Sequence, residues 1–386
     1  MDWALECNFC QPHHHELRPV MPTMIPMILG LTLAASLPPD PVTGFAQARV
    51  VPAGASLIYT DQVFPDGGTV SGQTKEALQR LSQIVGGLDR IVKLHGIVAP
   101  EVDENQVLDA LKTSFPEPQN RPALTLVRSR VERAGAMVGF DAVAISQYGR
   151  KGSSQSATLP PNGRIDIAGQ AEKADGTLKG CTRATLESLE KTLKGLGSDR
   201  SRIVQLKAFF KPMSEAATVR RVMREYFSGR EVPLVLVEWD MALPIEIELV
   251  AATGPETLGG MRFVTPPGMT SSPVFSRTAV TQGRFETTYT AGLTAPAGTD
   301  PKEQAKPIFT QLKSILASTG SDMGHLSKAT YYVSNPDANK SLDTIRPTIY
   351  DPKRPPSASK AGVSGVIPGT GRGVMVDMIA IRIMPF

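Results

Sequence analysis

Apolar residues recur at helical spacing three times along the chain, at intervals of 112 and then 123 residues. In the first run, Thr74–Leu88, they occupy the i, i+3, i+4 and i+7 positions that form one face of a helix. Runs at Leu186–Leu196 and Phe309–Leu316 repeat this pattern. Asp300 followed by Pro301 is typical of a helix start before the third run. We therefore predict three equivalent helices.

The same intervals relate further elements. Strand-like runs open at Ile91, Ile203 and Leu326. A second helix of each unit is predicted to end at Phe115, Phe227 and Tyr350. Two closing strands follow, most clearly in the middle of the chain, where 232–239 and 245–252 flank a turn at Met241–Pro244. A fixed interval kept across helix, strand and helix indicates an internal repeat.

The repeats predict an α+β protein built from three similar units, each a mixed sheet with two helices. The expected boundaries are 49–147, 148–255 and 256–386, and each of these segments is long enough to form one α+β domain with its own core. The joins fall near 146–156 and 253–272, which are rich in Gly, Ser, Thr and Pro.

Residues 1–48 differ from the rest and have the character of a leader. Val20–Leu37 carries no charge, Arg18 precedes it, and Ala46-Gln47-Ala48 has the small-x-small pattern of a signal peptidase site. We expect a signal peptide cleaved near Ala48 and a protein exported to the periplasm or the outside of the cell, with no membrane association afterwards. The alternatives are a retained anchor or a leader that is not a signal, which would leave the protein in the cytoplasm.

The leader also holds Cys7 and Cys10, followed by His13–His15. Thiolates and imidazoles at such spacing are zinc ligands in other proteins. The alternative, which we favour, is that this segment precedes the true start and that Met21 or Met24 begins the signal, so we expect no metal site. The remaining cysteine, Cys181, is expected to be structural.

The repeated unit resembles the RidA/YjgF family, also called endoribonuclease L-PSP. The resemblance rests on Ala168-Gly169-Gln170, on Pro233–Glu238 and on Leu243–Glu248, and it extends more loosely over residues 50–384. It implies a chorismate-mutase-like α+β fold. Because members resembling this chain are homotrimers with clefts between subunits, it also implies that three fused units form a pseudo-trimer within one chain, with any further oligomer left open.

The resemblance implies hydrolysis of 2-imino acids to 2-oxo acids and ammonia. That chemistry requires a cation, ideally arginine, to hold the substrate carboxylate, and a carboxyl group to position water. The positions that match the family's arginine hold Leu124, Leu234 and Ala358. The family's glutamate persists only as Glu246, since its counterparts are Gly139 and Met375. The sequence therefore predicts the family's fold but lacks most of the family's catalytic residues.

Glu246 is accordingly the candidate catalytic residue, with the polar face of a strand as the alternative explanation. Lys360 and Arg128 are candidate replacement cations for substrate binding, because residues two or four apart on a strand share a face. Solvated charges are the plainer explanation for both. Gly169 and Gly292 after the early strands, and Phe275 at a cleft entrance, complete the expected binding residues.

Charge argues against a nucleic-acid partner. The formal net charge is only +4, and the densest basic stretch, Arg220 to Arg230, lies around an amphipathic helix whose solvated face it would form. We therefore expect a divergent family member that binds a small anion or imino acid, with imine deaminase activity lost or weak and no cofactor. The alternatives are an active 2-imino acid deaminase that uses Glu246 and a relocated cation, an endoribonuclease or RNA-binding protein, and a purely structural role.

Overall fold

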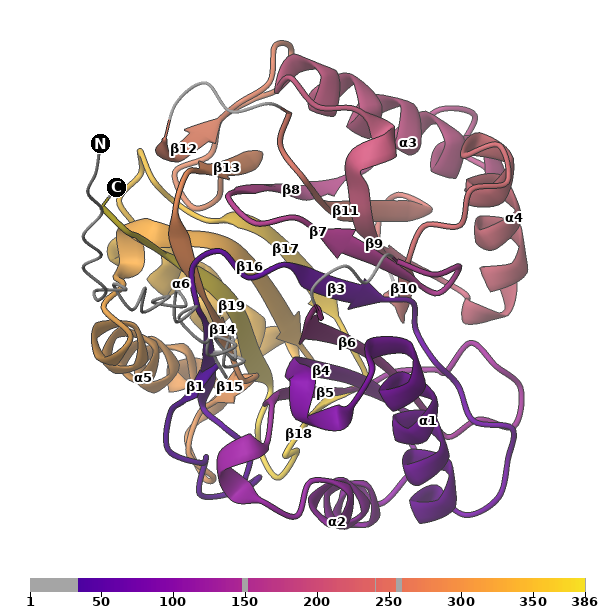
Figure 1. Ribbon diagram of the computed structural model, residues 1–386, viewed down its shortest axis with the longest axis vertical. Helices are drawn as coiled ribbons and strands as arrows, with labels where there is room; N and C mark the ends of the chain where they lie inside the picture. The colour runs from indigo at the N-terminus through magenta and orange to yellow at the C-terminus, as the bar shows by residue number, and fades with distance from the viewer. Residues whose placement is uncertain (1–33, 148–151, 240, 255–258, 386) are drawn as a thin grey trace, which may run out of the picture. The chain divides into compact units, whose positions relative to one another are not determined.

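Three mixed β-sheets, each covered on one face by two helices, make up the computed structural model, which describes residues 34–147, 152–239, 241–254 and 259–385. We name them sheet 1, sheet 2 and sheet 3, after the order in which their central strands β4, β9 and β16 occur in the chain. The helices lie on the outer side of the strands in Figure 1. The predicted α+β class is confirmed.

Each sheet has six strands in its main order. Across sheet 1 these are β18 (Gly365–Ile367), β5 (Ala123–Arg128), β4 (Ile91–Val98), β6 (Val138–Ile145), β3 (Leu57–Thr60) and β7 (Ser156–Leu159). Across sheet 2 they are β10 (Leu234–Glu238), β9 (Ile203–Phe210), β11 (Ile245–Ala251), β8 (Gly163–Gln170), β13 (Thr278–Gln282) and β12 (Gly260–Val264). Across sheet 3 they are β1 (Ala35–Ser36), β2 (Ala48–Val51), β14 (Phe285–Thr290), β19 (Val374–Ile383), β16 (Leu326–Val333) and β17 (Ser357–Gly362), with β15 (Leu293–Thr294) paired to β19.

The helices follow the predicted pairs. They are α1 (Val70–Val85) and α2 (Glu104–Ser114) on sheet 1, α3 (Leu178–Gly195) and α4 (Ala216–Tyr226) on sheet 2, and α5 (Ala305–Ser318) and α6 (Pro336–Ile349) on sheet 3. Short 3₁₀ turns precede several elements, at Leu88–Arg90, Pro118–Asn120, Arg200–Arg202, Met213–Glu215, Pro301–Glu303 and Met323–His325.

Local capping explains where the first helix differs from its prediction. The helix expected at Thr74–Leu88 is α1, which begins four residues earlier because Thr69 caps it by accepting a hydrogen bond from the Gly72 N–H. It ends before Gly86, whose φ of 85° is a left-handed conformation that glycine adopts readily. The predicted ends of the second helices are confirmed, since Phe115, Phe227 and Tyr350 each follow the last helical residue directly.

Consecutive strands near the start of each unit are divided between two sheets. β2 pairs with β14 of sheet 3, whereas β3 belongs to sheet 1. β7 pairs with β3 of sheet 1, whereas β8 belongs to sheet 2. β13 pairs with β8 of sheet 2, whereas β14 belongs to sheet 3. Each sheet therefore takes a strand from another segment of the chain, in a closed cycle.

The faces of the sheets that are not covered by helices meet one another. Two apolar clusters form there, each with side chains from all three sheets. One includes Val92, Val204 and Tyr289, and the other includes Ile97, Phe209 and Tyr332. The residues of β4, β9 and β16 that point into the space between these clusters are polar, whereas alternate residues such as Leu94 and Leu206 face the helices. A polar layer is therefore enclosed between two apolar ones.

Most of the expected leader lies outside the described residues, including Arg18, the Cys7, Cys10 and His13–His15 cluster, and Val20–Leu37 up to residue 33. Ala48, the expected cleavage point, is the first residue of β2 and is buried. Within the described part of the chain, no helix combines the length and apolar character needed to cross a bilayer.

Candidate functional site

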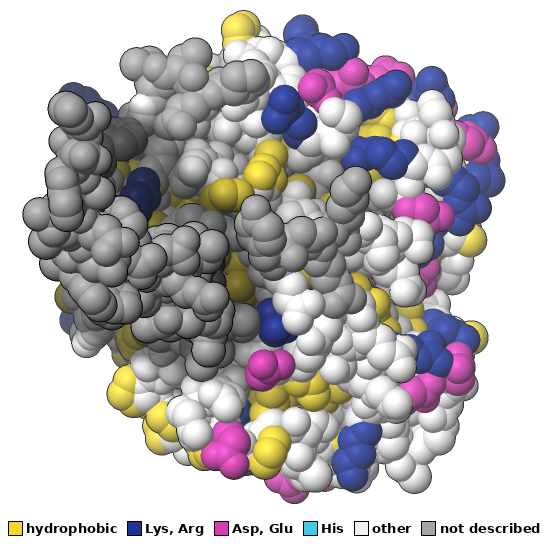
Figure 2. Space-filling model, in the orientation of Figure 1, with side chains coloured by type: hydrophobic (Ala, Val, Ile, Leu, Met, Phe, Trp, Pro, Cys, Tyr) yellow, Lys and Arg dark blue, Asp and Glu magenta, His cyan; other side chains and the backbone are white. Residues whose placement is uncertain are grey.

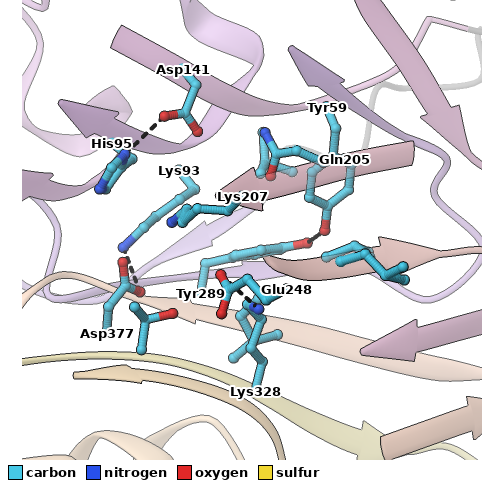
Figure 3. Close-up of a pocket in the computed structure, with 15 residues that line it drawn as sticks. Tyr59, Lys93, His95, Asp141, Gln205, Lys207, Glu248, Tyr289, Lys328 and Asp377 are labelled. Atoms are coloured by element: carbon cyan, nitrogen blue, oxygen red, sulfur yellow. Dashed lines mark hydrogen bonds and ion pairs between the residues drawn. The ribbon is translucent and has the colours of Figure 1, made fainter. Parts of the chain in front are cut away.

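The polar layer surrounds a small cavity of about 60 Å³ where the three sheets meet (Figure 3). Equivalent positions of the central strands supply Lys93, Gln205 and Lys328, and the next inward positions supply His95, Lys207 and Thr330. The facing antiparallel strands supply three carboxylates, Asp141, Glu248 and Asp377. Positions separated by the intervals of 112 and 123 residues therefore lie together around the cavity.

Ion pairs in this layer connect different sheets. Lys93 on β4 lies 2.9 Å from Asp377 on β19, and Lys328 on β16 lies 2.9 Å from Glu248 on β11. Burial lowers the pKa of Lys93, although Asp377 opposes that effect. Burial would raise the pKa of Asp377, but Lys93 and then Lys207 outweigh it and hold the pKa below its ordinary value. The pair joins sheet 1 to sheet 3.

The histidine in the cavity has no free ring nitrogen. Nδ1 of His95 lies 2.8 Å from Asp141, and Nε2 lies 3.1 Å from the hydroxyl of Tyr332 on sheet 3. That hydroxyl also accepts a hydrogen bond from Lys207 of sheet 2. Burial lowers the pKa of His95, so the ring is neutral near pH 7. His95 is accordingly a link between sheets and is not placed as a general base.

A second polar contact closes one end of the cavity. The guanidinium of Arg164, which is fully buried, binds both carboxylate oxygens of Asp166 at 2.7 Å. It also contacts the hydroxyls of Tyr59 and Tyr289, which bond to each other at 2.6 Å. With three lysines facing three carboxylates, the layer is balanced in charge. Its clearest physical effect is to align the three sheets.

The three sheets meet at three junctions. At each, a residue at or just after the end of an inner strand of one sheet contacts the strand that pairs in parallel with the central strand of the next sheet, namely β10, β17 or β5. At junction 1–2 the Gln62 N–H donates to the Leu234 carbonyl, at 3.3 Å. At junction 2–3 the Gly169 N–H donates to Ser359 Oγ, at 3.0 Å. At junction 3–1 the Gly292 N–H donates to the Leu124 carbonyl, at 2.9 Å. At each of the three junctions, this backbone N–H therefore already donates a hydrogen bond within the protein.

The positions matched to the family's arginine face the helices. Leu124 and Leu234 are buried in the cores beneath the helices of sheets 1 and 2, and Ala358 packs on the core of sheet 3. Side chains alternate along a strand, so the following residues face the other way. Those residues are Thr125, Val235 and Ser359. Neither set contains a cation.

Two junctions are filled by apolar side chains. The ring of Phe64 packs directly against Gly139 at junction 1–2, and the thioether of Met375 packs against Gly292 at junction 3–1. Gly139 and Met375 stand where the resemblance places the family's glutamate. Junction 2–3 is different because the carboxyl group of Glu246 itself lies against Gly169.

Glu246 is placed by β11, whose register shifts between Ile247 and Leu249. Burial raises the pKa of its carboxyl group to about 7, with a smaller contribution from Glu248, while Lys328 and Arg277 act in the opposite direction. A carboxyl group with this pKa exists in both protonation states near neutral pH. It can therefore donate a hydrogen bond or accept a proton at junction 2–3.

Arg277 is a residue of this junction that the sequence analysis did not single out. Its Nε donates to the Thr270 carbonyl at 3.0 Å and its Nη2 to Thr270 Oγ1 at 3.2 Å. Its guanidinium lies over the ring of Phe275, 4.9 Å from the centroid. Within the described residues it has no ion pair with a carboxylate. The backbone carbonyl of Arg277 accepts from the Ala168 N–H, which fixes this segment beside Gly169.

The structure therefore brings Glu246, Gly169 and the Phe275–Arg277 segment to one junction, and it places the other expected residues elsewhere. Lys360 shares the Ala358 face of β17 and is paired at 3.0 Å with Asp343 of α6. Arg128 is paired at 2.9 Å with Glu104 of α2. Gly292 lies at junction 3–1. Cys181 is buried in α3, and burial raises the pKa of its thiol.

Among the described residues, no group of three or more His, Cys, Asp and Glu side chains is arranged to hold a metal ion. The Cys7, Cys10 and His13–His15 cluster is not part of that set. Lys and Arg side chains over α3 and α4 are interspersed with Asp and Glu (Figure 2). Arg220, for example, is held by Glu132 and lies 3.5 Å from Asp61.

A family model described as endoribonuclease L-PSP matches residues 151–253, which include β7 to β11. No curated protein matches the chain significantly. Solved structures of similar proteins align with part of it. A YjgF-family protein from Neisseria meningitidis is 18% identical and is covered over 98% of its length, which corresponds to 33% of this chain, with a TM-score of 0.24.

Two further solved structures are similar over comparable parts. A protein of the conserved Rid family from Yersinia pestis, described as of unknown function, is 23% identical over 97% of its length and 31% of this chain, with a TM-score of 0.28. A YjgF/YER057c/UK114-family protein from Mycobacterium tuberculosis is 19% identical over 77% of its length and 24% of this chain, with a TM-score of 0.22.

Proposed function

We propose that this chain, which residues 151–253 place in the endoribonuclease L-PSP family (the RidA/YjgF family), is a divergent member of it. It binds a small anionic metabolite at junction 2–3, and its imine deaminase activity is lost or weak. The observation that carries this proposal is the guanidinium of Arg277. It is near enough to lower the pKa of Glu246, and it forms no ion pair with a carboxylate among the described residues.

The recognition would be that of a carboxylate by arginine. A guanidinium presents several N–H donors in a plane and forms charge-assisted hydrogen bonds to carboxylates. Thr270 and the ring of Phe275 hold Arg277 in place, which reduces the conformational entropy that binding would otherwise cost. Glu246 does not oppose an anion when it is protonated.

The loss of hydrolysis is inferred from the same junction. The Gly169 N–H is already bonded to Ser359, and Lys360 and Arg128 are neutralised by carboxylates elsewhere. In this junction, Arg277 would have to hold the substrate carboxylate, and Glu246 would have to position the water. An active deaminase that uses these two residues is the alternative, and the two functions differ in turnover.

The test uses the full chain. Pyruvate is titrated as the probe by calorimetry, and ammonia release is measured with 2-iminopropanoate generated in situ. We expect pyruvate binding that Arg277→Gln weakens by roughly 10- to 100-fold, as for loss of a hydrogen bond to a charged group, and no turnover above the spontaneous rate. Arg284→Gln, which removes an exposed arginine from the β13–β14 turn, is the matched control.

Two results would count against the proposal. Turnover that Glu246→Gln abolishes would establish the deaminase alternative. Pyruvate affinity that is equal in Arg277→Gln and Arg284→Gln would remove junction 2–3 as the binding site. The RNA-binding alternative has less support, because basic residues of α4 such as Arg220 and Arg221 are paired with carboxylates.

We also propose that the protein is exported, on the basis of the apolar stretch Val20–Leu37 and the Ala46-Gln47-Ala48 pattern. Cleavage after Ala48 would separate β1 from β2 and remove Phe45, which is buried and packs edge-to-face on Phe115. Cleavage nearer residue 34 would keep both contacts. The position of the mature N-terminus therefore matters for the fold.

A further inference from the structure

A larger pocket lies beside junction 1–2. Its volume is about 490 Å³, which is in the range of small-molecule binding sites. It is lined by the segment after β3, by the second half of α1, by the β5–β6 loop and by the segment that leads into the first residue of β7. Its lining includes Gln62, Phe64, Arg80, Arg133, Ser153 and Ser156. None of these residues belongs to junction 2–3.

Two arginines of this pocket share one carboxylate. Nη2 of Arg80 binds Asp66 Oδ2, and Nη2 of Arg133 binds Asp66 Oδ1. Arg80 also donates from Nη1 to the Phe64 carbonyl at 2.7 Å and contacts Glu76. A carboxylate that bridges two guanidinium groups has the geometry that a bound oxyanion would adopt. Asp66 therefore resembles a ligand supplied by the chain itself.

The bridging carboxylate is on an exposed and conformationally permissive segment. The side chain of Asp66 is 61% exposed, and the exposed ion pairs it forms contribute little to stability. Gly67 and Gly68 follow it with φ values of 146° and 98°. The Asp66 N–H donates to the Glu76 carboxylate of α1 at 3.2 and 3.3 Å. Since glycine adopts many backbone conformations at little cost, the two glycines let the Asp66 side chain turn away from the arginines while the backbone of α1 stays in place.

The arginines, in contrast, are on supported elements. Arg80 is part of α1. The loop that carries Arg133 is held by the buried side chain of Gln73, whose amide group donates to the Gly135 carbonyl at 3.1 Å and accepts from the Met137 N–H at 2.7 Å. The two cations are thus more firmly placed than the carboxylate between them.

We propose that this pocket binds a small oxyanion, a carboxylate- or phosphate-bearing metabolite, through Arg80 and Arg133, and that Asp66 occupies the arginine pair in the free protein. The hydroxyls of Ser153 and Ser156, which also line the pocket and lie 3.0 Å apart, would hydrogen-bond the polar remainder of the ligand. This inference does not depend on the function proposed for junction 2–3.

Calorimetry on the full chain tests the proposal, with inorganic phosphate in one arm and acetate in the other. Arg277→Gln is the background throughout, so that junction 2–3 does not contribute. We expect Asp66→Asn to tighten binding of the preferred probe by about tenfold, because it removes the competing carboxylate. Arg80→Gln or Arg133→Gln should weaken it by about tenfold or more. The arm with the tighter binding identifies the oxyanion class.

The controls are matched in charge. Asp109→Asn and Arg130→Gln change exposed residues outside the pocket, and both should leave the affinity unchanged. The proposal is overturned if neither probe binds the Asp66→Asn protein, if both arginine variants bind as well as their background, or if the controls shift the affinity as much as the pocket variants do. Binding seen only after Asp66→Asn supports it.

Discussion

Glu246→Gln should change how stability depends on pH. Burial raises the pKa of Glu246 from 4.5 to about 7, so the folded protein holds this proton more tightly than the unfolded chain does. The carboxyl group ionises in the unfolded chain near pH 4.5 and in the folded protein only near pH 7. Folding is therefore progressively disfavoured as the pH rises between these values, and the effect is complete above pH 7.

The magnitude follows from the shift. Each pKa unit corresponds to about 1.4 kcal/mol, so an ionised Glu246 would lower the free energy of unfolding by roughly 3 kcal/mol at alkaline pH, and by about 2.5 kcal/mol between pH 5 and pH 8. Glutamine has nearly the same shape and does not ionise in this range. The free energy of unfolding of Glu246→Gln, measured relative to wild type, should thus be about 2.5 kcal/mol higher at pH 8 than at pH 5.

Urea unfolding at the two pH values measures this difference, and a ¹³C carboxyl titration of Glu-labelled protein locates the pKa directly. Glu187→Gln, on the exposed face of α3, is the control and should show no such change. Equal effects of Glu246→Gln at pH 5 and pH 8, or a resonance assigned to Glu246 that titrates near 4.5, would refute the reasoning. It would also remove the argument that Glu246 tolerates a nearby anion.

Two further expectations concern the central layer and the leader. Lys328→Met leaves Glu248 buried without its partner, so it should lower the free energy of unfolding, measured in urea, by about 3–5 kcal/mol. Adding Glu248→Leu should recover most of that loss. A double variant as unstable as the single one would contradict the pairing. N-terminal sequencing of the protein purified from its native host should find a mature terminus between residues 34 and 49. An intact Met1 on the functional protein would contradict export.

Local pattern is sufficient to predict the elements. The apolar spacing in α1, α3 and α5 and the strand-like runs of β4 and β9 depend on neighbouring residues, which a sequence displays directly. Even the ends of α2, α4 and α6 are predictable, because an aromatic residue follows each at equivalent positions.

The division of strands between sheets cannot be predicted in this way. β2 and β3 are separated by only a few residues, yet they pair in different sheets, with β14 and β6. That choice depends on hydrogen bonds between residues far apart in the chain. A hairpin within one unit satisfies the local pattern equally well.

The candidate site shows the same limit. A motif identifies Glu246, but Arg277 lies near enough to affect its pKa only because β13 of the next segment pairs with β8. Lys360 lies two residues beyond Ala358, and the rule that these share a face is correct; what spacing does not reveal is that this face meets α6 and Asp343. Which side chains meet across a junction is decided by the register of several strands together.

The cyclic sharing of strands also determines how the assembly responds to dilution. If three separate chains exchanged strands in this way, their association would be lost as concentration fell, and their stability would depend on the amount of protein present. Here the linking segments keep the three sheets at an effective concentration that dilution does not change. The protein can therefore maintain its junctions at the low abundance at which a separate-subunit counterpart would dissociate.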